Sequence, residues 1–294
     1  MYKVDKLKIL LTGIGCPGTP GTAYSLKEHT LFGQDEKSET AGSSFVEKTF
    51  ITKDLESLFG FVDVVIPQTT KQVNEYHNRQ KVMSEGDILT ANDKLNLYKI
   101  AKHIEVPVPE TYLARSLNEF FEIMDFMKYP VVVKPVFGNG SRGVRVIHDK
   151  PMSIEAFLDK PDPLYMTKDD FRKIFQNEFK EMLVCDYLPG REYTIDCFYD
   201  GETFVAIPRE RTEIRSGISF YTKVVLREDL IKYSRYLAEK LNLRYAFGFQ
   251  FKEDVNGLPR LLECNPRVQG TMVTSVFAGF NIINNAVKVI LGIK

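Results

Sequence analysis

The sequence predicts an α/β protein in which a small parallel unit precedes a longer α+β region. Two patterns indicate this fold class. Short apolar runs alternate with helix-compatible segments in the first third of the chain, whereas strand-like runs crowd the last third. The chain has 294 residues, which exceeds the size of one ordinary hydrophobic core, so we expect two or three compact units.

The first unit is predicted over residues 1–91. Residues 7–11 and 61–67 are short and apolar, as buried strands are. Between them, a turn rich in glycine and proline leads to a predicted helix over 22–27, and residues 70–85 are compatible with a further helix. This alternation favours a small parallel sheet.

Two further units are predicted, over residues 92–180 and 181–294. A helix is expected to reach residue 103, because Asn92 or Asp93 can cap its first turn. Other predicted elements of residues 92–180 are a helix over 117–127, a strand over 131–133 and two short amphipathic helices between 150 and 180. In residues 181–294 we expect strands over 182–187, 193–199, 203–208, 246–252 and 260–264, with helices over 227–241 and 281–291.

Composition excludes several classes of protein. Lys plus Arg and Asp plus Glu number 39 each, so no overall field would attract nucleic acid or an anionic membrane. No run approaches the ~18 apolar residues that a spanning helix needs, and the start of the chain does not resemble a signal peptide. We therefore predict a cytoplasmic protein that binds neither nucleic acid nor membrane. The scattered cysteines predict reduced thiols.

A glycine-rich loop follows a predicted buried strand that ends near Lys134. Its glycines, which let backbone N–H groups approach an anion, and its side-chain donors can fold over phosphate groups. A second cation, Lys94, stands at the start of a predicted helix. Considered alone, the loop is better explained as an ordinary hairpin turn. The loop residues concerned are Gly138, Gly140, Ser141, Arg142 and Gly143.

A second cluster surrounds the link between two predicted strands near residue 190. Asp186 and Glu192 flank this link, and carboxylates there can accept hydrogen bonds from ribose hydroxyls. Tyr187 and Leu188 offer backbone groups and apolar surface to an adenine ring. The cluster thus predicts a site for the nucleoside part of a nucleotide.

A third cluster indicates a metal site. Glu263 and Asn265 are one residue apart on a predicted strand, so their side chains point to the same face. Carboxylate and amide oxygens suit a hard cation such as Mg²⁺ (or Mn²⁺), and Gln250 on a neighbouring strand can supply another oxygen. Glu263 alone would be explained as a solvated carboxylate, but the order of all these clusters favours a nucleotide and metal site.

Three arginines follow the strand predicted over 203–208, namely Arg209, Arg211 and Arg215. Their spacing suits bidentate recognition of a substrate carboxylate. Glu210 and Glu213 are interleaved with them, so a solvated, self-paired charge run is the competing interpretation.

Together these clusters resemble the ATP-grasp superfamily and, within it, the large-subunit-like proteins of carbamoyl phosphate synthase. The most specific pieces are Glu-Cys-Asn-Pro-Arg at 263–267 and Leu-Pro-Gly-Arg-Glu-Tyr at 188–193. The resemblance covers roughly residues 88–294. It implies a two-subdomain ATP-grasp fold, preceded by a small Rossmann-like pre-ATP-grasp domain.

The resemblance also implies roles for individual residues. Lys94 and Lys134 would contact nucleotide phosphates beneath the glycine loop, residues 186–188 would form the adenine-side hinge, and Glu192 would bind ribose. Asp186 stands where this group usually has glutamate. Arg211 and Arg215 are favoured as substrate-binding residues. The remaining implied roles are Mg²⁺ ligands for Gln250, Glu263 and Asn265, and a phosphate or transition-state cation for Arg267.

The activity that this resemblance implies is that of an ATP-dependent carboxylate–amine ligase. Mg-ATP would phosphorylate a carboxylate or bicarbonate to an acyl phosphate, which an amine or ammonia then attacks. Bicarbonate with ammonia, two amino acids, or a modified lysine or peptide carboxylate all remain compatible substrates. An ammonia-supplying subunit, a second ATP-grasp subunit or a homodimer is compatible as well.

Two alternatives stay open. Residues 13–18 fit G-x-G-x-x-G after a strand, and Asp35 lies roughly where an NAD(P)-binding domain places its ribose-binding acid. An oxidoreductase is therefore the rival enzyme class, although Pro17 crowds the helix start and no pattern for hydride transfer follows. The third candidate is a partner-dependent ATP-binding subunit, against which the complete set of metal ligands argues.

Overall fold

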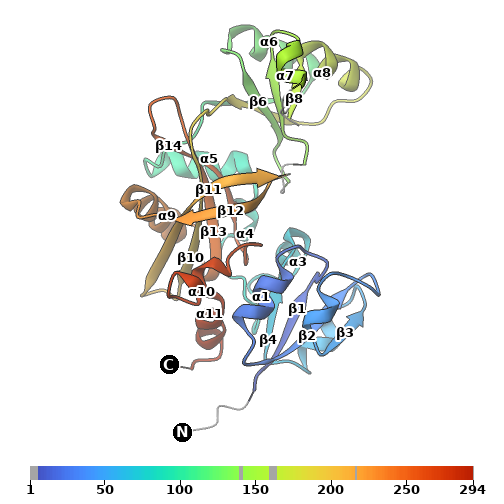
Figure 1. Ribbon diagram of the computed structural model, residues 1–294, viewed down its shortest axis with the longest axis vertical. Coiled ribbons are helices and arrows are strands. Elements are labelled where there is room, and N and C mark those ends of the chain that lie inside the picture. Colours follow the sequence, from blue (N-terminus) through green and yellow to red (C-terminus); the bar gives the residue numbers. More distant parts are fainter. Residues whose placement is uncertain (1–5, 139–141, 159–163, 216, 294) are drawn as a thin grey trace.

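The structure is a computed structural model that describes residues 6–138, 142–158, 164–215 and 217–293. It contains three sheets, and Figure 1 shows them as three lobes along the long axis of the molecule. The N-terminal lobe and the C-terminal sheet lie side by side, and the middle segment of the chain forms the lobe at the far end. Among the described residues, no helix has the length and apolar character needed to cross a membrane.

The N-terminal lobe is a four-stranded parallel sheet in the order β3-β2-β1-β4, which confirms the predicted fold class of this region. β1 lies in the interior, and Ile9, Leu10 and Leu11 are completely buried. The elements are β1 (Lys8–Thr12), α1 (Thr19–Ser25), β2 (Thr30–Asp35), η1 (Ser43–Phe45), β3 (Lys48–Ile51), α2 (Glu56–Phe59), β4 (Val64–Pro67) and α3 (Thr70–Tyr76).

Several boundaries in this lobe differ from those predicted. α1 begins three residues early, because Pro20 is well suited to the first turn of a helix. The helix expected over 70–85 ends at Tyr76, and Asn78 and Lys81 beyond it have positive φ angles that a helix does not accommodate. The prediction missed β2 and β3 altogether.

The middle lobe is a five-stranded sheet in the order β5-β9-β6-β7-β8. Its core includes Phe120 and Phe171, whose rings stack with centroids 4.0 Å apart. β9 pairs with β5 and β6 and so joins this sheet, although we predicted it within the last unit. The elements are β5 (Thr111–Ala114), α6 (Leu117–Phe126), β6 (Val131–Pro135), β7 (Arg145–His148), α7 (Ile154–Leu158), β8 (Tyr165–Thr167), α8 (Lys168–Phe175) and β9 (Met182–Asp186).

The C-terminal lobe is an antiparallel sheet in the order β12-β11-β10-β13-β14. β11 extends to Arg215 and forms a hairpin with β12, so the three arginines lie within a strand and do not follow one. The elements are α4 (Ile88–Asn92), α5 (Lys94–His103), β10 (Glu192–Tyr199), β11 (Phe204–Arg215), β12 (Ile218–Val224), α9 (Glu228–Lys240), β13 (Tyr245–Glu253), β14 (Pro259–Asn265), α10 (Thr274–Phe277) and α11 (Ile282–Ile290).

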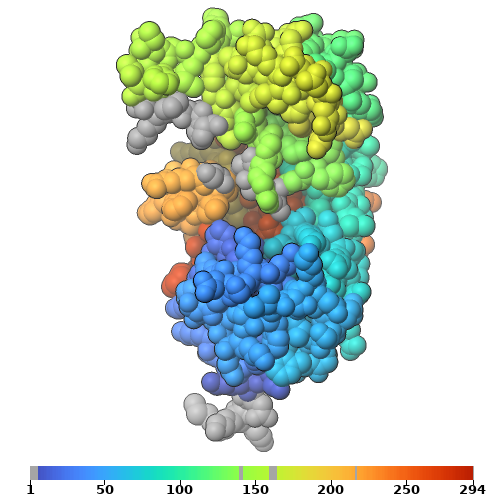
Figure 2. Space-filling model, turned by 90° about the vertical axis from the view of Figure 1, so that its right-hand side faces the viewer, coloured from blue at the N-terminus to red at the C-terminus, as the bar shows by residue number. Residues whose placement is uncertain are grey.

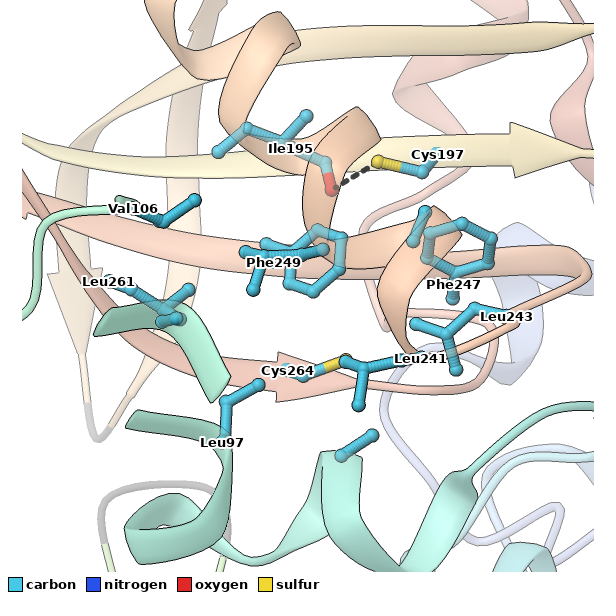
Figure 3. Packing of buried hydrophobic residues seen from close by; sticks show 14 of the residues in the cluster. Leu97, Val106, Ile195, Cys197, Leu241, Leu243, Phe247, Phe249, Leu261 and Cys264 are labelled. Atoms are coloured by element: carbon cyan, nitrogen blue, oxygen red, sulfur yellow. Dashed lines mark hydrogen bonds between the residues drawn. The ribbon is translucent and has the colours of Figure 1, made fainter. Parts of the chain in front are cut away.

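One face of this sheet is apolar, and the other is apolar where α11 packs on it and polar around Gln250. Alternate residues of β13, among them Phe247 and Phe249, enter one core with Ile195 and Cys197 of β10 (Figure 3). Leu97 of α5 packs on the same core, so this helix covers the C-terminal sheet. The sheets group α5 with the C-terminal lobe and β9 with the middle lobe. The predicted division of the chain into domains at residues 91/92 and 180/181 stays a prediction.

A β-bulge in β14 decides which of its side chains reach the polar face. Gln250 lies opposite Glu263, whereas Phe251 lies opposite Leu261, so Leu262 has no residue opposite it. Leu261 and Cys264 consequently both enter the apolar core despite their spacing of three (Figure 3). Beyond the bulge, Glu263 alternates with Cys264 and turns toward the polar face beside Gln250.

Candidate functional site

The candidate site lies where the polar face of the C-terminal sheet meets the start of α5 and the end of β6. Figure 2 shows a hollow bounded by the β11–β12 hairpin, the N-terminal lobe and the far lobe, with atoms of the C-terminal region at its floor. A cavity of about 60 Å³ lies at the junction of these parts. Its lining includes Lys94, Gly138, Glu263, Asn265, Thr70 and Asn74.

Two buried lysines, Lys94 and Lys134, stand near each other, and Lys94 lines this cavity. The Nζ of Lys94 donates to the carbonyl of Gly138 (2.5 Å) and lies 3.9 Å from the carboxylate of Glu263. Burial lowers the pKa of Lys94, and the nearby charge of Lys134 lowers it further, while the charge of Glu263 opposes both. Asp93 caps α5, accepting from the backbone N–H of Asn96 (3.0 Å), as the sequence predicted.

Lys134 is also buried and is held by a tyrosine that the sequence did not single out. Its Nζ donates to the hydroxyl of Tyr98 (2.7 Å), which in turn donates to the carbonyl of Leu262 (2.7 Å). Burial raises the pKa of Tyr98 to about 12, so its hydroxyl stays protonated at neutral pH. Tyr98 lies four residues after Lys94 on α5, a spacing that puts both on one helix face and was the available signal.

The predicted metal ligands form a continuous group. The Nδ2 of Asn265 donates to the Oε1 of Glu263 (3.1 Å), and Gln250 lies opposite Glu263 on the neighbouring strand. All of them present carboxylate or amide oxygens, the donor type that Mg²⁺ prefers. The structure thus brings together the three residues that the sequence predicted for a metal.

Arg267 directly follows this group. Its Nη2 donates to the Oδ1 of Asn265 (3.2 Å) and its Nη1 to the carbonyl of Val268 (3.0 Å). In the part of the chain that the structure describes, its buried Nε has no hydrogen-bond partner. Burial lowers the pKa of Arg267. An unsatisfied, desolvated donor of this kind costs about 1–3 kcal/mol, which a bound anion would recover.

The three arginines of β11 have different surroundings. Arg209 is completely buried and binds both oxygens of Asp196 (2.7 and 3.0 Å), so it is neither solvated nor paired within the charge run. Arg215 is exposed, contacts Glu213 (2.5 Å) and stacks over the ring of Phe220. Neither arginine contacts the predicted metal ligands in these hydrogen bonds.

Arg211 is the arginine that reaches the site. Its Nη1 donates to the Oε1 of Gln250 (3.2 Å) and to the carboxylate of Glu192. Its other nitrogens donate to the hydroxyl of Ser219 (2.6 Å) and the carbonyl of Gly217 (2.7 Å), which fix the guanidinium plane. Arg211 therefore joins the predicted ribose acid to a predicted metal ligand.

The hinge residues lie at the junction of two sheets. The Asp186 carboxylate accepts from the backbone N–H of Glu110 (3.2 Å), and burial raises its pKa. Leu188 is buried, while Tyr187 is partly exposed with the Nζ of Lys252 6.0 Å from its ring centre. Asp186 thus accepts a hydrogen bond from the backbone, whereas the longer side chain of a glutamate at this position would reach farther.

The glycine loop is described only in part. Gly138 and Gly143 have φ angles of 148° and 75°, which residues with a side chain rarely adopt. Arg142 is exposed beside Gly143. The predicted phosphate contacts of Gly140 and Ser141 lie outside the described residues.

The N-terminal turn of the rival hypothesis is closely packed. The carboxylate of Asp35 accepts from the backbone N–H of Gly15 (2.9 Å) and so stabilises the turn itself. Gly18 lies against Gly270 so closely that an added Cβ would be 2.4 Å from its Cα. A segment of the C-terminal region therefore packs against the last glycine of this turn.

Cavity residues from the N-terminal lobe were not predicted. Thr70 and Asn74 lie four residues apart on α3, so the helix presents both on one face toward the cavity. The same spacing is common on any surface helix, and only the tertiary contact with α4 and the start of α5 distinguishes this pair.

Two family models match separate parts of the chain, and both are models of ATP-binding regions of ATP-grasp type. One, described as "ATP-grasp in the biosynthetic pathway with Ter operon", matches residues 178–294. The other, "Carbamoyl-phosphate synthase L chain, ATP binding domain", matches residues 93–161. The predicted resemblance to ATP-grasp proteins is thereby confirmed.

Within the superfamily, the chain resembles the large chains of carbamoyl phosphate synthase. It is 27% identical to that of Clostridium acetobutylicum over 231 residues, which are 74% of this chain and 20% of that protein. The chain thus spans about one fifth of the length of such curated relatives.

Solved structures with the same fold confirm the predicted architecture. N5-carboxyaminoimidazole synthetase from Staphylococcus aureus, complexed with ADP, has a TM-score of 0.76 and 16% identity, covering 100% of this chain and 80% of that one. The biotin carboxylase domain dimer of the Hydrogenobacter thermophilus 2-oxoglutarate carboxylase, with MgADP, ADP and bicarbonate, has a TM-score of 0.71 and 15% identity, covering 98% and 70%. Their ligands agree with the cofactors predicted here, ATP and Mg²⁺.

Proposed function

We propose that this chain is a Mg-ATP-dependent ligase that phosphorylates a carboxylate or bicarbonate to an acyl phosphate for attack by an amine or ammonia. The observation that supports it best is the convergence of cations and oxygen ligands on one polar sheet face. Two buried lysines, Lys94 and Lys134, stand beside Glu263, whose strand continues to Arg267.

The nucleotide would lie between the middle and C-terminal sheets. Lys94 and Lys134 would contact its phosphates, with the glycine loop above them, and residues 186–188 would border the adenine. Glu192 would accept from the ribose hydroxyls. Its carboxylate now binds Arg211 and lies 3.7 Å from the Nζ of Lys252, so the ribose would share an acid that is already held in place.

The metal would be bound by Glu263, Asn265 and Gln250. The amide oxygens of Asn265 and Gln250 accept from Arg267 and Arg211, and each amide oxygen has a second lone pair for a cation. Mg²⁺ bound there would neutralise charge on the phosphate oxygens during transfer.

The side chains would act mainly by positioning and charge neutralisation. The substrate carboxylate oxygen attacks the γ-phosphorus, the bond to the β,γ-bridging oxygen breaks, and ADP leaves. The amine nitrogen then attacks the acyl carbon, inorganic phosphate leaves, and the nitrogen releases its proton to solvent. Arg267 and Arg211 would hold the negative charge of the phosphoryl and acyl oxygens, with Arg215 as an outer contact for substrate.

The substrates and partners are proposed only as classes. A small-molecule carboxylate and an amine would meet at the cavity between Asn265 and the α3 residues Thr70 and Asn74. A homodimer, an ammonia-supplying subunit and a second ATP-grasp subunit stay predictions. The Hydrogenobacter thermophilus biotin carboxylase domain is a dimer in complex with bicarbonate, which makes bicarbonate a first substrate to test.

The test is a screen for carboxylate-dependent ADP formation. Bicarbonate and single amino acids would be incubated with the protein, Mg-ATP and hydroxylamine, which traps acyl phosphates of organic acids as hydroxamates. We expect ADP to form with one class of carboxylate and only with Mg²⁺ present. A protein that binds NADH or NADPH but no Mg-nucleotide would contradict the proposal and favour the oxidoreductase.

A further inference from the structure

The hydroxyl of Tyr98 joins three elements that come from separate parts of the chain. Tyr98 lies on α5, accepts a hydrogen bond from Lys134 of β6, and donates one to Leu262 of β14. Both donor–acceptor distances are 2.7 Å, and Tyr98 is 3% exposed. The ring also lies 5.1 Å from the Nζ of Lys134, so the ammonium contacts the aromatic face as well as the hydroxyl.

The acceptor of this chain of hydrogen bonds is the bulged residue of β14. Because Leu262 has no residue opposite it on β13, its carbonyl is available to a group outside the sheet. The bulge is what turns Glu263 to the polar face while Leu261 stays in the core. A donor on the Leu262 carbonyl therefore supports the local geometry on which the predicted metal ligand depends.

The other end of the chain is the ammonium of Lys134, which is 6% exposed. Among the hydrogen bonds of the described residues, the bond to Tyr98 is the one that orients it. A lysine side chain has four rotatable bonds and three equivalent donors, so it needs such a partner to keep one orientation when buried. The hydroxyl thus fixes the position of the Lys134 ammonium relative to β14.

We propose that Tyr98 is a positioning residue that couples the phosphate-binding Lys134 to the bulge that orients the metal ligand Glu263. This inference rests on the proposed function of the same site. Because of this coupling, the nucleotide phosphates and the metal ion would bind to one preformed group of residues. A shift of β14 would change the position of Lys134, and a shift of Lys134 would change the position of β14.

Tyr98→Phe tests this proposal with little change in packing, because it keeps the ring and removes only the hydroxyl. We expect the Kd for MgADP, measured by calorimetry, to rise about tenfold, as follows from losing a hydrogen bond to a charged group. The Mg²⁺ concentration that half-saturates ADP binding should rise as well. No other amino acid restores a hydroxyl at this position while keeping the ring. A double-mutant cycle therefore supplies the control.

In that cycle, Lys134→Met removes the ammonium but keeps an apolar side chain of similar length. If Tyr98 acts through Lys134, Tyr98→Phe should change MgADP affinity by less than about twofold in the Lys134→Met background. A tenfold loss in both backgrounds would overturn the proposal, and so would an unchanged Kd in the single variant.

A matched control is available on the same sheet. Tyr193 is equally buried and donates to Glu253 (2.9 Å) away from the site. Tyr193→Phe should lower the free energy of unfolding by an amount similar to that for Tyr98→Phe, yet leave the Kd for MgADP unchanged. Equal losses of affinity in the two variants would mean a general structural effect and overturn the proposal. A wild-type chain that binds no MgADP would overturn both this proposal and the proposed function.

Discussion

The two faces of the C-terminal sheet use the same strands for different purposes. On one face, Phe247, Phe249 and Phe251 of β13 are buried against α5 and α9, which stabilises the lobe. On the other face, Gln250 of the same strand lies among charged groups that are paired with one another. The comparison teaches that alternation along a strand can separate folding from ligand binding residue by residue.

The arginines of β11 show the same separation within the polar face. Arg209 has no exposed surface and makes a two-bond pair with Asp196, to which Gln269 also donates (3.2 Å). Arg211, two residues farther along, reaches Glu192 and Gln250 at the edge of the cavity. Polar character alone therefore does not mark a ligand-binding residue, and the two arginines differ in whether their partners belong to the proposed site.

The largest expected effect is on stability from the apolar face. Phe249→Ala should lower the free energy of unfolding by about 3–5 kcal/mol, because a completely buried ring leaves a cavity. Chemical denaturation measures this change. Phe220→Ala, at a ring that is 61% exposed on β12, should stay within about 0.5 kcal/mol of wild type. Similar losses for both would break the distinction between a folding face and an exposed edge.

Next in size is the effect of the metal ligand. Glu263→Gln keeps the shape of the side chain but removes its charge, so carboxylate-dependent ADP formation should fall about 100-fold. The free energy of unfolding should change by less than about 1 kcal/mol, since Glu263 is partly exposed. Glu213→Gln, on the outer part of the hairpin, is the control and should leave turnover unchanged. Full turnover in Glu263→Gln at saturating Mg²⁺ would refute the metal assignment.

A smaller effect is expected from the arginines. Arg211→Lys keeps the positive charge but loses the fork that joins Glu192 to Gln250, so kcat/KM for the carboxylate should fall about tenfold. Arg215→Ala should lower it less than about threefold, because that side chain is exposed and paired with Glu213. Steady-state kinetics on both variants measure kcat/KM. A larger loss for Arg215→Ala than for Arg211→Lys would contradict this ranking.

Sequence reasoning reached the fold class and the residues proposed for the site because both depend on local patterns. The buried strand before the glycine loop, the cap at Asp93 and the alternation at Glu263 and Asn265 are each visible within a few residues. The parallel N-terminal sheet was likewise expected, although β2 and β3 were missed.

The remainder depends on contacts between distant segments. β9 pairs with β5 and β6, and Arg209 forms an ion pair with Asp196. The sequence carries no signal that these separated residues are in contact. The bulge at Leu262 arises because Leu261 and Cys264 must both enter the core. Tyr98 belongs to the site because α5 lies beside β6 and β14 in the fold.

The most direct test of the central claim is thermal stabilisation by Mg²⁺ with a non-hydrolysable ATP analogue, compared with NADH and NADPH. At about 100 times its Kd, a ligand adds about 2.7 kcal/mol, a shift in Tm of about 4–5 °C for a chain of this size. We predict a Mg²⁺-dependent shift with the ATP analogue that Lys134→Ala reduces at the same ligand concentration. A shift with a dinucleotide and none with the ATP analogue would contradict the account.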